Sequence, residues 1–490
     1  MINILPRRFI SQPAFLNPEK LLTLRIESLR MKKWLVVIFI VISGAAFTRV
    51  LDLIPFELVH IPPSPQRLGG DSAKGYQYLT TGDYVKGGIP FSVFVMGMGK
   101  DSRNYLHREG KNEKLSHEYT AINAGNGEVL VAPNCLQCHA QVMDDQLYMG
   151  LGNSLIDFTQ NEKLNIRNLK KVEAWLKLTA PKKYEASRSF IEITKAIGPY
   201  LSTEVRGVNA ADRLAALLAA HRDPVTFKWI DTPALEIPQQ LIPTDVPAWW
   251  LLKKKNAMFY NGFGRGDFGK FLMASNLLTV NDTSESREVD SHMPDVLAYI
   301  YSLQAPKFPG PIDEALAAEG KVLFDGNCSK CHGTYGDSIS YPNLLVPQHI
   351  IKTDSLLFTS NYSNPQFVEW FNNSWFTKGD HPAKLEPYAG YIAPPLDGIW
   401  ITAPYLHNGS VPDLESLLNS KLRPQYWSRD FDQPQYNHNN PGWAYKRHDK
   451  PGKKNIYNTD LPGYSNKGHY FGDKLTDKER KALIGYLKTL

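Results

Sequence analysis

The chain has 490 residues, of which 42% are hydrophobic, and a formal net charge of +6. This length and apolar content are enough for at least two hydrophobic cores. Residues 1–33 carry +5 of the charge, so a chain that starts at Ala46 carries only +1 and offers no electrostatic case for nucleic-acid binding.

Residues 31–47 have the pattern of a secretory signal. Two lysines follow Met31, an apolar run covers residues 34–42, and small residues lead to Ala45, after which we place the cleavage. The run is shorter than the ~20 residues of a membrane span. A retained anchor in the cytoplasmic membrane is the alternative, because residues 50–59 are again fairly apolar. We expect a periplasmic or secreted protein in which residues 1–30 are an over-extended gene start.

Two pentapeptides, CLQCH at 135–139 and CSKCH at 328–332, share the pattern C-x-x-C-H, which is typical of c-type haem attachment. The two thiols form thioethers with the porphyrin, and the adjacent histidine binds iron. All four cysteines of the chain lie in these motifs, and a zinc site or a redox dithiol does not require a histidine after both pairs. The sequence therefore predicts two covalently bound haems c, held by Cys135, Cys138, His139, Cys328, Cys331 and His332. Export agrees with this prediction, because haem is attached outside the bacterial cytoplasmic membrane.

The remaining pattern is mainly helical. The expected helices cover parts of 161–221, then 294–303, 313–324 and the last residues, which begin with the capping box TDKE at 476–479. The helix ends AYIYSL and GYLKTL resemble each other, so we read them as the last helices of two cytochrome c-like modules. The expected fold is mainly α, with two haem modules, long loops and a helical insertion after the first motif. The expected divisions are 1–45 (over-extended start plus signal or anchor), 46–68 (linker), 69–305 (first module with the insertion) and 306–490 (second module).

The sixth iron ligand determines what each haem can do. No methionine lies beyond Met293, so the second haem has no methionine ligand from its own module. We rank His469 first and His407 second as its distal ligand, with Tyr405 a weaker candidate. For the first haem the site is open or filled by a methionine, and the candidates are Met96, Met98, Met143 and Met149. His107 and His117, upstream of the first motif, are read as surface residues.

Several stretches resemble the bacterial di-haem cytochrome c peroxidase superfamily, with the closest likeness to its di-haem rubber oxygenase branch. They are the two haem motifs, DVPAWW at 245–250, PLDGIW at 395–400, TAPYLHNGSVP at 402–412, and DLPG with SNKGH at 460–469. The resemblance implies that the N-terminal haem is reactive, that the C-terminal haem relays an electron, and that Trp249 or Trp250 couples them. Ordinary core packing is the alternative for these tryptophans.

The expected function is thus that of an oxidoreductase. The iron held by His139 would act on peroxide, dioxygen or an organic substrate, and a small protein would donate or accept electrons. A plain electron-transfer cytochrome with two six-coordinate haems is the first alternative. A non-catalytic subunit of a respiratory complex is the second, favoured if residues 34–47 stay as an anchor.

Overall fold

The computed structural model describes residues 57–159 and 162–490, all within one unit of the chain that spans residues 55–490. The expected signal or anchor and the over-extended start lie outside the described residues, as do residues 46–56 of the expected linker. In the described part of the chain, no helix combines the length and the apolar character needed to cross a bilayer.

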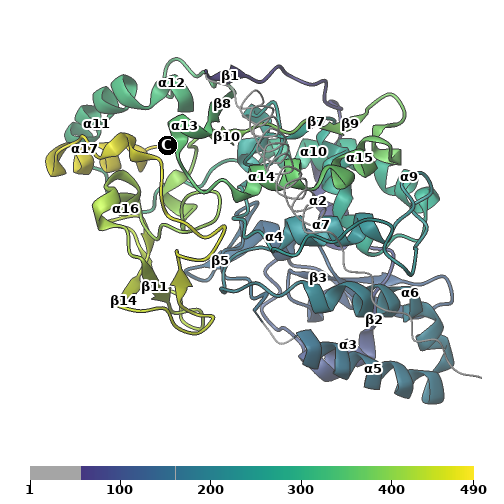
Figure 1. Cartoon of the computed structure of the whole chain (residues 1–490). Helices are drawn as coiled ribbons and strands as arrows, with labels where there is room; N and C mark the ends of the chain where they lie inside the picture. Colours follow the sequence, from purple (N-terminus) through teal and green to yellow (C-terminus); the bar gives the residue numbers. More distant parts are fainter. Residues whose placement is uncertain (1–56, 160–161) are drawn as a thin grey trace, which may run out of the picture. The chain divides into compact units, whose positions relative to one another are not determined.

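The described residues are mainly helical, as predicted (Figure 1). The α-helices before residue 310 are α2 (Ser72–Thr81), α3 (Phe91–Met98), α4 (Leu136–His139), α5 (Glu162–Thr179), α6 (Pro181–Ile197), α7 (Ala211–Ala220), α8 (Phe268–Leu272), α9 (Thr283–Ser291) and α10 (Met293–Ser302). Those after it are α11 (Glu314–Asn327), α12 (Ser329–His332), α13 (Gln348–Ile351), α14 (Leu356–Ser363), α15 (Pro365–Asn372), α16 (Leu414–Leu418) and α17 (Asp477–Leu487). The predicted capping box is present at the start of α17, where Thr476 and Glu479 bond reciprocally.

Two helix pairs of the described residues pack closely. Helix α2 packs on α10, and α11 packs on α17 (Figure 1). Each pair touches backbone to backbone at a glycine: a Cβ at Gly75 would lie 2.0 Å from the Asp295 carbonyl oxygen, and a Cβ at Gly320 would lie 2.0 Å from that of Ala482. The two helix ends that resemble each other in sequence therefore lie in helices, α10 and α17, that each contact an earlier helix at a glycine.

Short strands were not part of the sequence prediction, and the fold is mixed rather than purely helical. The strands are β1 (Val59–His60), β2 (Ile89–Pro90), β3 (Tyr119–Asn123), β4 (Val129–Pro133), β5 (Ala140–Met143), β6 (Gln146–Met149), β7 (Gly264–Gly266), β8 (Leu344–Pro347), β9 (Ala383–Leu385), β10 (Gly390–Ile392), β11 (Tyr426–Arg429), β12 (Tyr436–Asn437), β13 (Gly442–Trp443), β14 (Tyr445–His448) and β15 (Tyr457–Asn458). The three-stranded sheets have the orders β2-β4-β3, β1-β8-β10 and β14-β11-β15. The pairs β5-β6, β7-β9 and β12-β13 complete the sheets of the described residues.

Two of these sheets bracket the first C-x-x-C-H motif. Strand β4 runs into Asn134, and the β5-β6 hairpin begins directly after His139. The hairpin turns at Asp144 and Asp145, whose φ angles of 51° and 59° match the left-handed backbone that two-residue hairpin turns require. The motif is thus fixed at both ends by paired strands.

Candidate haem-binding site

The first motif is held in place by Asn134 and Asn209. The Asn134 side chain accepts from the backbone N–H of Leu136 at 2.9 Å and donates to the His117 carbonyl at 2.9 Å, which anchors the start of α4. Asn209 donates to the Cys138 sulfur at 3.2 Å. All four cysteines are free and half-buried, so both thiol pairs are available for thioether formation.

His139 lies against Trp249. The two rings stack with centroids 4.5 Å apart and planes 17° apart. Burial lowers the pKa of His139 to about 3, so the imidazole is neutral and keeps a lone pair for a metal. The main chains of His139 and Trp249 are also connected through Gly150. The Gly150 N–H donates to the His139 carbonyl, and the Trp249 N–H donates to the Gly150 carbonyl, both at 2.8 Å.

The second motif follows α11, and its histidine has a fixed tautomer. His332 Nδ1 lies 2.8 Å from the Pro394 carbonyl oxygen, which can only accept, so Nδ1 carries the proton. This leaves Nε2 with the lone pair that ligation needs, and the same arrangement orients metal-binding histidines generally. Burial also lowers the pKa of His332.

His469 is the ring that faces His332. Their centroids are 6.2 Å apart and their planes 61° apart. Two imidazoles bound to one metal from opposite sides have centroids about 6 Å apart, because each metal–nitrogen bond is about 2 Å. Burial lowers the pKa of His469 to about 3, and its Nδ1 has no hydrogen-bond partner among the described residues. The pair fits a bis-histidine iron site.

The loop of His469 is clamped by Arg423, a residue that the sequence did not single out. The guanidinium donates to the carbonyls of Asn466 at 2.6 Å, Gly468 at 2.7 Å and His469 at 3.3 Å. Gly468 has φ +85° and a Cβ there would lie 2.2 Å from the backbone nitrogen of Thr353. Close contact with residues 352–353 therefore fixes the position from which His469 reaches His332.

His407 has different neighbours. Its ring stacks on Tyr391 with centroids 4.2 Å apart, and its carbonyl accepts from Asp245 N–H at 2.8 Å. The Tyr405 hydroxyl donates to the Ile399 and Pro441 carbonyls. The geometry thus favours His469 over His407 and Tyr405 as the partner of His332, and it gives the 404–410 loop a structural role.

The four candidate methionine ligands of the first haem differ in exposure and in the core that they contact. Met96 and Met98 are 70% and 68% exposed, so they do not pack against the half-buried His139. Met143 is buried in a hydrophobic core that contains Trp250, and Met149 packs at the edge of a different core that contains Trp249.

The two histidines upstream of the first motif differ in exposure. His107 is exposed, as predicted, whereas His117 is half-buried and burial lowers its pKa to about 4.

Trp249 and Trp250 belong to different cores. Trp249 is buried with Leu136 of the first motif, and Trp250 is buried with Phe324 of α11, which leads into the second motif. The Trp250 indole N–H donates to the Asp397 carbonyl at 2.8 Å. The two neighbouring residues are packed as core residues, and together they join the surroundings of the two motifs.

Buried arginines without carboxylate hydrogen bonds also suit haem, whose propionates are anions. Arg265 is 3% exposed, and its three guanidinium nitrogens have no hydrogen-bond partner among the described residues, although Glu386 lies 3.7 Å away. One guanidinium nitrogen of Arg213 on α7 is likewise buried and unpartnered there. Buried cationic groups need a partner, so an anion such as a propionate would suit either residue.

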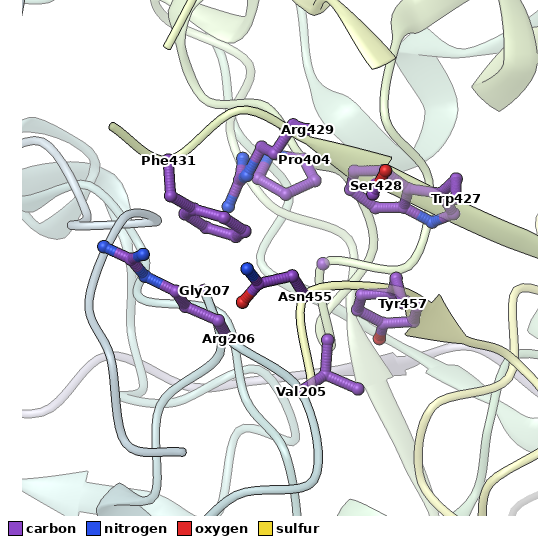
Figure 2. A pocket seen from close by; sticks show the side chains of 11 residues that line it. Val205, Arg206, Gly207, Pro404, Trp427, Ser428, Arg429, Phe431, Asn455 and Tyr457 are labelled. Atoms are coloured by element: carbon purple, nitrogen blue, oxygen red, sulfur yellow. The ribbon is translucent and has the colours of Figure 1, made fainter. Parts of the chain in front are cut away.

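The small pocket of Figure 2 is a packing junction rather than a haem site. Its volume of about 10 Å³ is enough for one water molecule. The Phe431 ring lies between the guanidiniums of Arg206 and Arg429, at 4.5 and 4.9 Å (Figure 2). Arg429 also bonds the Ser154 carbonyl. The junction thus ties the loop after the first motif to β11.

Asp245 is a half-buried acid that the sequence analysis names only as part of the DVPAWW stretch. Tyr260 donates to its carboxylate at 2.7 Å. Burial raises the pKa of Asp245 to about 7, and it lies close enough to Arg429 for their charges to interact. The sequence pattern around Asp245 does not indicate that this carboxyl group has a raised pKa.

Comparison with known proteins identifies one region. A RoxA-like, cytochrome c-like family matches residues 390–428, which include PLDGIW and LHNGS. The chain is similar to two proteins of Sinorhizobium fredii (strain NBRC 101917 / NGR234), "Uncharacterized protein y4iM" and "Uncharacterized protein y4iJ". The first is 29% identical over 42% of this chain and 51% of the relative, and the second is 38% identical over 38% and 41%.

The chain thus spans about half the length of one of these relatives and less of the other. Neither name states an activity. The family match indicates a c-type cytochrome related to the rubber oxygenase family and implies haem c as the cofactor.

Proposed function

We propose that this chain is an exported di-haem c-type cytochrome that acts as an oxidoreductase on peroxide or dioxygen. The observation that carries the proposal is the difference between the two motif histidines. A second imidazole faces His332 at the spacing of a bis-histidine iron, whereas the ring contact of His139 is a parallel stack with the Trp249 indole, which lies against the face of the imidazole and supplies no ligand. This supports a six-coordinate second haem, and in our proposal the first haem keeps an open position.

Two haem modules are supported by the repeated helix pair. Cytochrome c-like modules pack their first and last helices on each other, and α2 with α10 and α11 with α17 do so through Gly75 and Gly320. The insertion then consists of α5, α6 and α7, which follow the first motif.

Each protein group has a separate task in this proposal. Bound haem supplies the electron-transfer chemistry. Burial keeps His139, His332 and His469 neutral, so their lone pairs stay available. Trp249 and Trp250 link the two sites for electron transfer.

The proposed partners are a small electron-donor or electron-acceptor protein and peroxide, dioxygen or an organic substrate. The location is the periplasm or the exterior, with an N-terminal membrane anchor as the alternative.

The test is an electron paramagnetic resonance spectrum of the oxidised, purified holoprotein, after a pyridine haemochrome assay has counted its haems. We expect two haems per chain, with one high-spin and one low-spin ferric signal. Peroxide and dioxygen consumption would then be measured with candidate substrates. Two low-spin signals in the oxidised protein, and only low-spin ferric signal after addition of one electron, would contradict the enzyme and identify a plain electron carrier.

A further inference from the structure

Tyr335 lies between the tryptophan pair and the second motif. Its hydroxyl donates to the carbonyl of His332 at 3.1 Å and accepts from the backbone N–H of Leu396 at 2.6 Å. The next residue, Asp397, accepts the Trp250 indole N–H through its carbonyl at 2.8 Å. Three hydrogen bonds and one short stretch of backbone therefore join the Trp250 ring to the main chain of His332.

The path continues from Trp250 to the first motif. Trp249 is the adjacent residue, and its ring stacks on His139 at 4.5 Å. The Gly150 backbone adds two hydrogen bonds of 2.8 Å between the main chains of Trp249 and His139. Every contact between the two motif histidines along this route is covalent, hydrogen-bonded or a ring stack.

The Tyr335 ring is held in place independently of its hydroxyl. The Lys254 ammonium lies 4.9 Å from the ring centroid and also pairs with the Asp397 carboxylate at 2.7 and 2.8 Å. The Phe324 ring meets Tyr335 edge-on at 5.9 Å. Burial raises the pKa of Tyr335, so the hydroxyl keeps the proton that it donates to His332.

We propose that Tyr335 is a positioning residue for electron transfer between the two haem sites, because its hydroxyl closes the hydrogen-bonded path from Trp250 to His332. The inference rests on the proposed function, since it requires a haem at each motif. It adds a residue beyond the tryptophan pair.

The test uses the holoprotein with Tyr335→Phe, which removes the hydroxyl and keeps the ring. The matched control is Tyr341→Phe: Tyr341 is also half-buried, and its hydroxyl donates to the Ala393 carbonyl at 2.5 Å without a link to Trp250. Pulse radiolysis injects one electron, and absorbance follows its redistribution between the haems. We expect Tyr335→Phe to slow redistribution several-fold and Tyr341→Phe to leave the rate unchanged. Spectroelectrochemical titration of each variant checks that the driving force is the same.

A double-mutant cycle separates a shared path from a general structural effect. Trp250→Phe removes the indole N–H at the other end of the path, so the double variant Trp250→Phe/Tyr335→Phe should be no slower than the slower single variant. Equal rates for Tyr335→Phe and Tyr341→Phe, or slowing that multiplies in the double variant, would overturn the inference. If Tyr335→Phe does not fold, Trp250→Phe must slow redistribution relative to Tyr341→Phe, or the path is rejected.

Failure of the proposed function has a different signature. It shows in the unaltered protein as one haem per chain, as the absence of a low-spin bis-histidine signal, or as two low-spin haems with no high-spin signal. The Tyr335 inference fails only when both haems are present and exchange electrons at a rate that the path does not affect.

Discussion

The imidazoles of His332 and His469 face each other with their centroids 6.2 Å apart, although the two residues are 137 positions apart in the sequence. Replacement of His469 by Ala should remove one axial ligand and turn one low-spin ferric haem into a high-spin one. Electron paramagnetic resonance measures this change directly. The exposed His381 supplies the control, and His381→Ala should leave the spectrum unaltered. An unchanged low-spin signal in His469→Ala would redirect the assignment to His407.

The loop that carries His469 should depend on Arg423. Arg423→Met removes the donors to the Asn466 and Gly468 carbonyls and leaves these acceptors without a partner. We expect a loss of roughly 2–4 kcal/mol in the free energy of unfolding and partial conversion of the second haem to high spin. Denaturant titration and the same spectrum measure both effects.

Arg447 provides the comparison for this variant. It bonds the Leu422 carbonyl from a largely exposed position. Arg447→Met should therefore cost less than about 1 kcal/mol and leave the haem spectrum intact. Equal effects of the two variants would show that the clamp does not position the ligand.

Two glycines of helix α11 should respond in opposite directions to alanine. A Cβ at Gly320 would lie 2.0 Å from the Ala482 carbonyl oxygen, so Gly320→Ala must push α11 and α17 apart. The expected cost is about 1–3 kcal/mol. At Gly326 a Cβ meets no atom within 4 Å, so Gly326→Ala should stabilise the helix by about 0.5–1 kcal/mol. Thermal unfolding of both holoproteins measures the difference, and similar costs would contradict the close helix contact.

Local chemistry was predictable from the sequence, and long-range pairing was not. The C-x-x-C-H spacing, the capping box at Thr476 and the helix that precedes Cys328 depend on neighbouring residues only, and the structure has the last two where the pattern placed them. The haem attachment itself stays a prediction. The stack of Trp249 on His139 joins residues 110 positions apart, and no periodicity encodes it.

The strands and the Arg423 clamp were missed for a related reason. Strands of two to five residues are too short for an alternating pattern to stand out from loops. Arg423 acts on backbone carbonyls, which every residue has, so no partner type in the sequence reveals the contact. By contrast, the sequence ranks His469 first as a ligand because a second haem without a methionine requires another donor, and this assignment stays a prediction.

Asp245 should make stability depend on pH in a specific window. Its pKa is about 7 in the folded protein, where burial disfavours the charged form, against about 3.9 in an unfolded chain. Between these values the folded state binds more protons, so the free energy of unfolding falls as pH rises from about 4 to 7. Asp245→Asn keeps an acceptor for the Tyr260 hydroxyl and carries no charge at any pH. Denaturant titrations at pH 4 and pH 8 should therefore show similar stability at the lower pH and an advantage of about 2–4 kcal/mol for the variant at the higher pH. A constant difference between the two proteins at both pH values would show that the carboxyl group does not change its protonation state in this range.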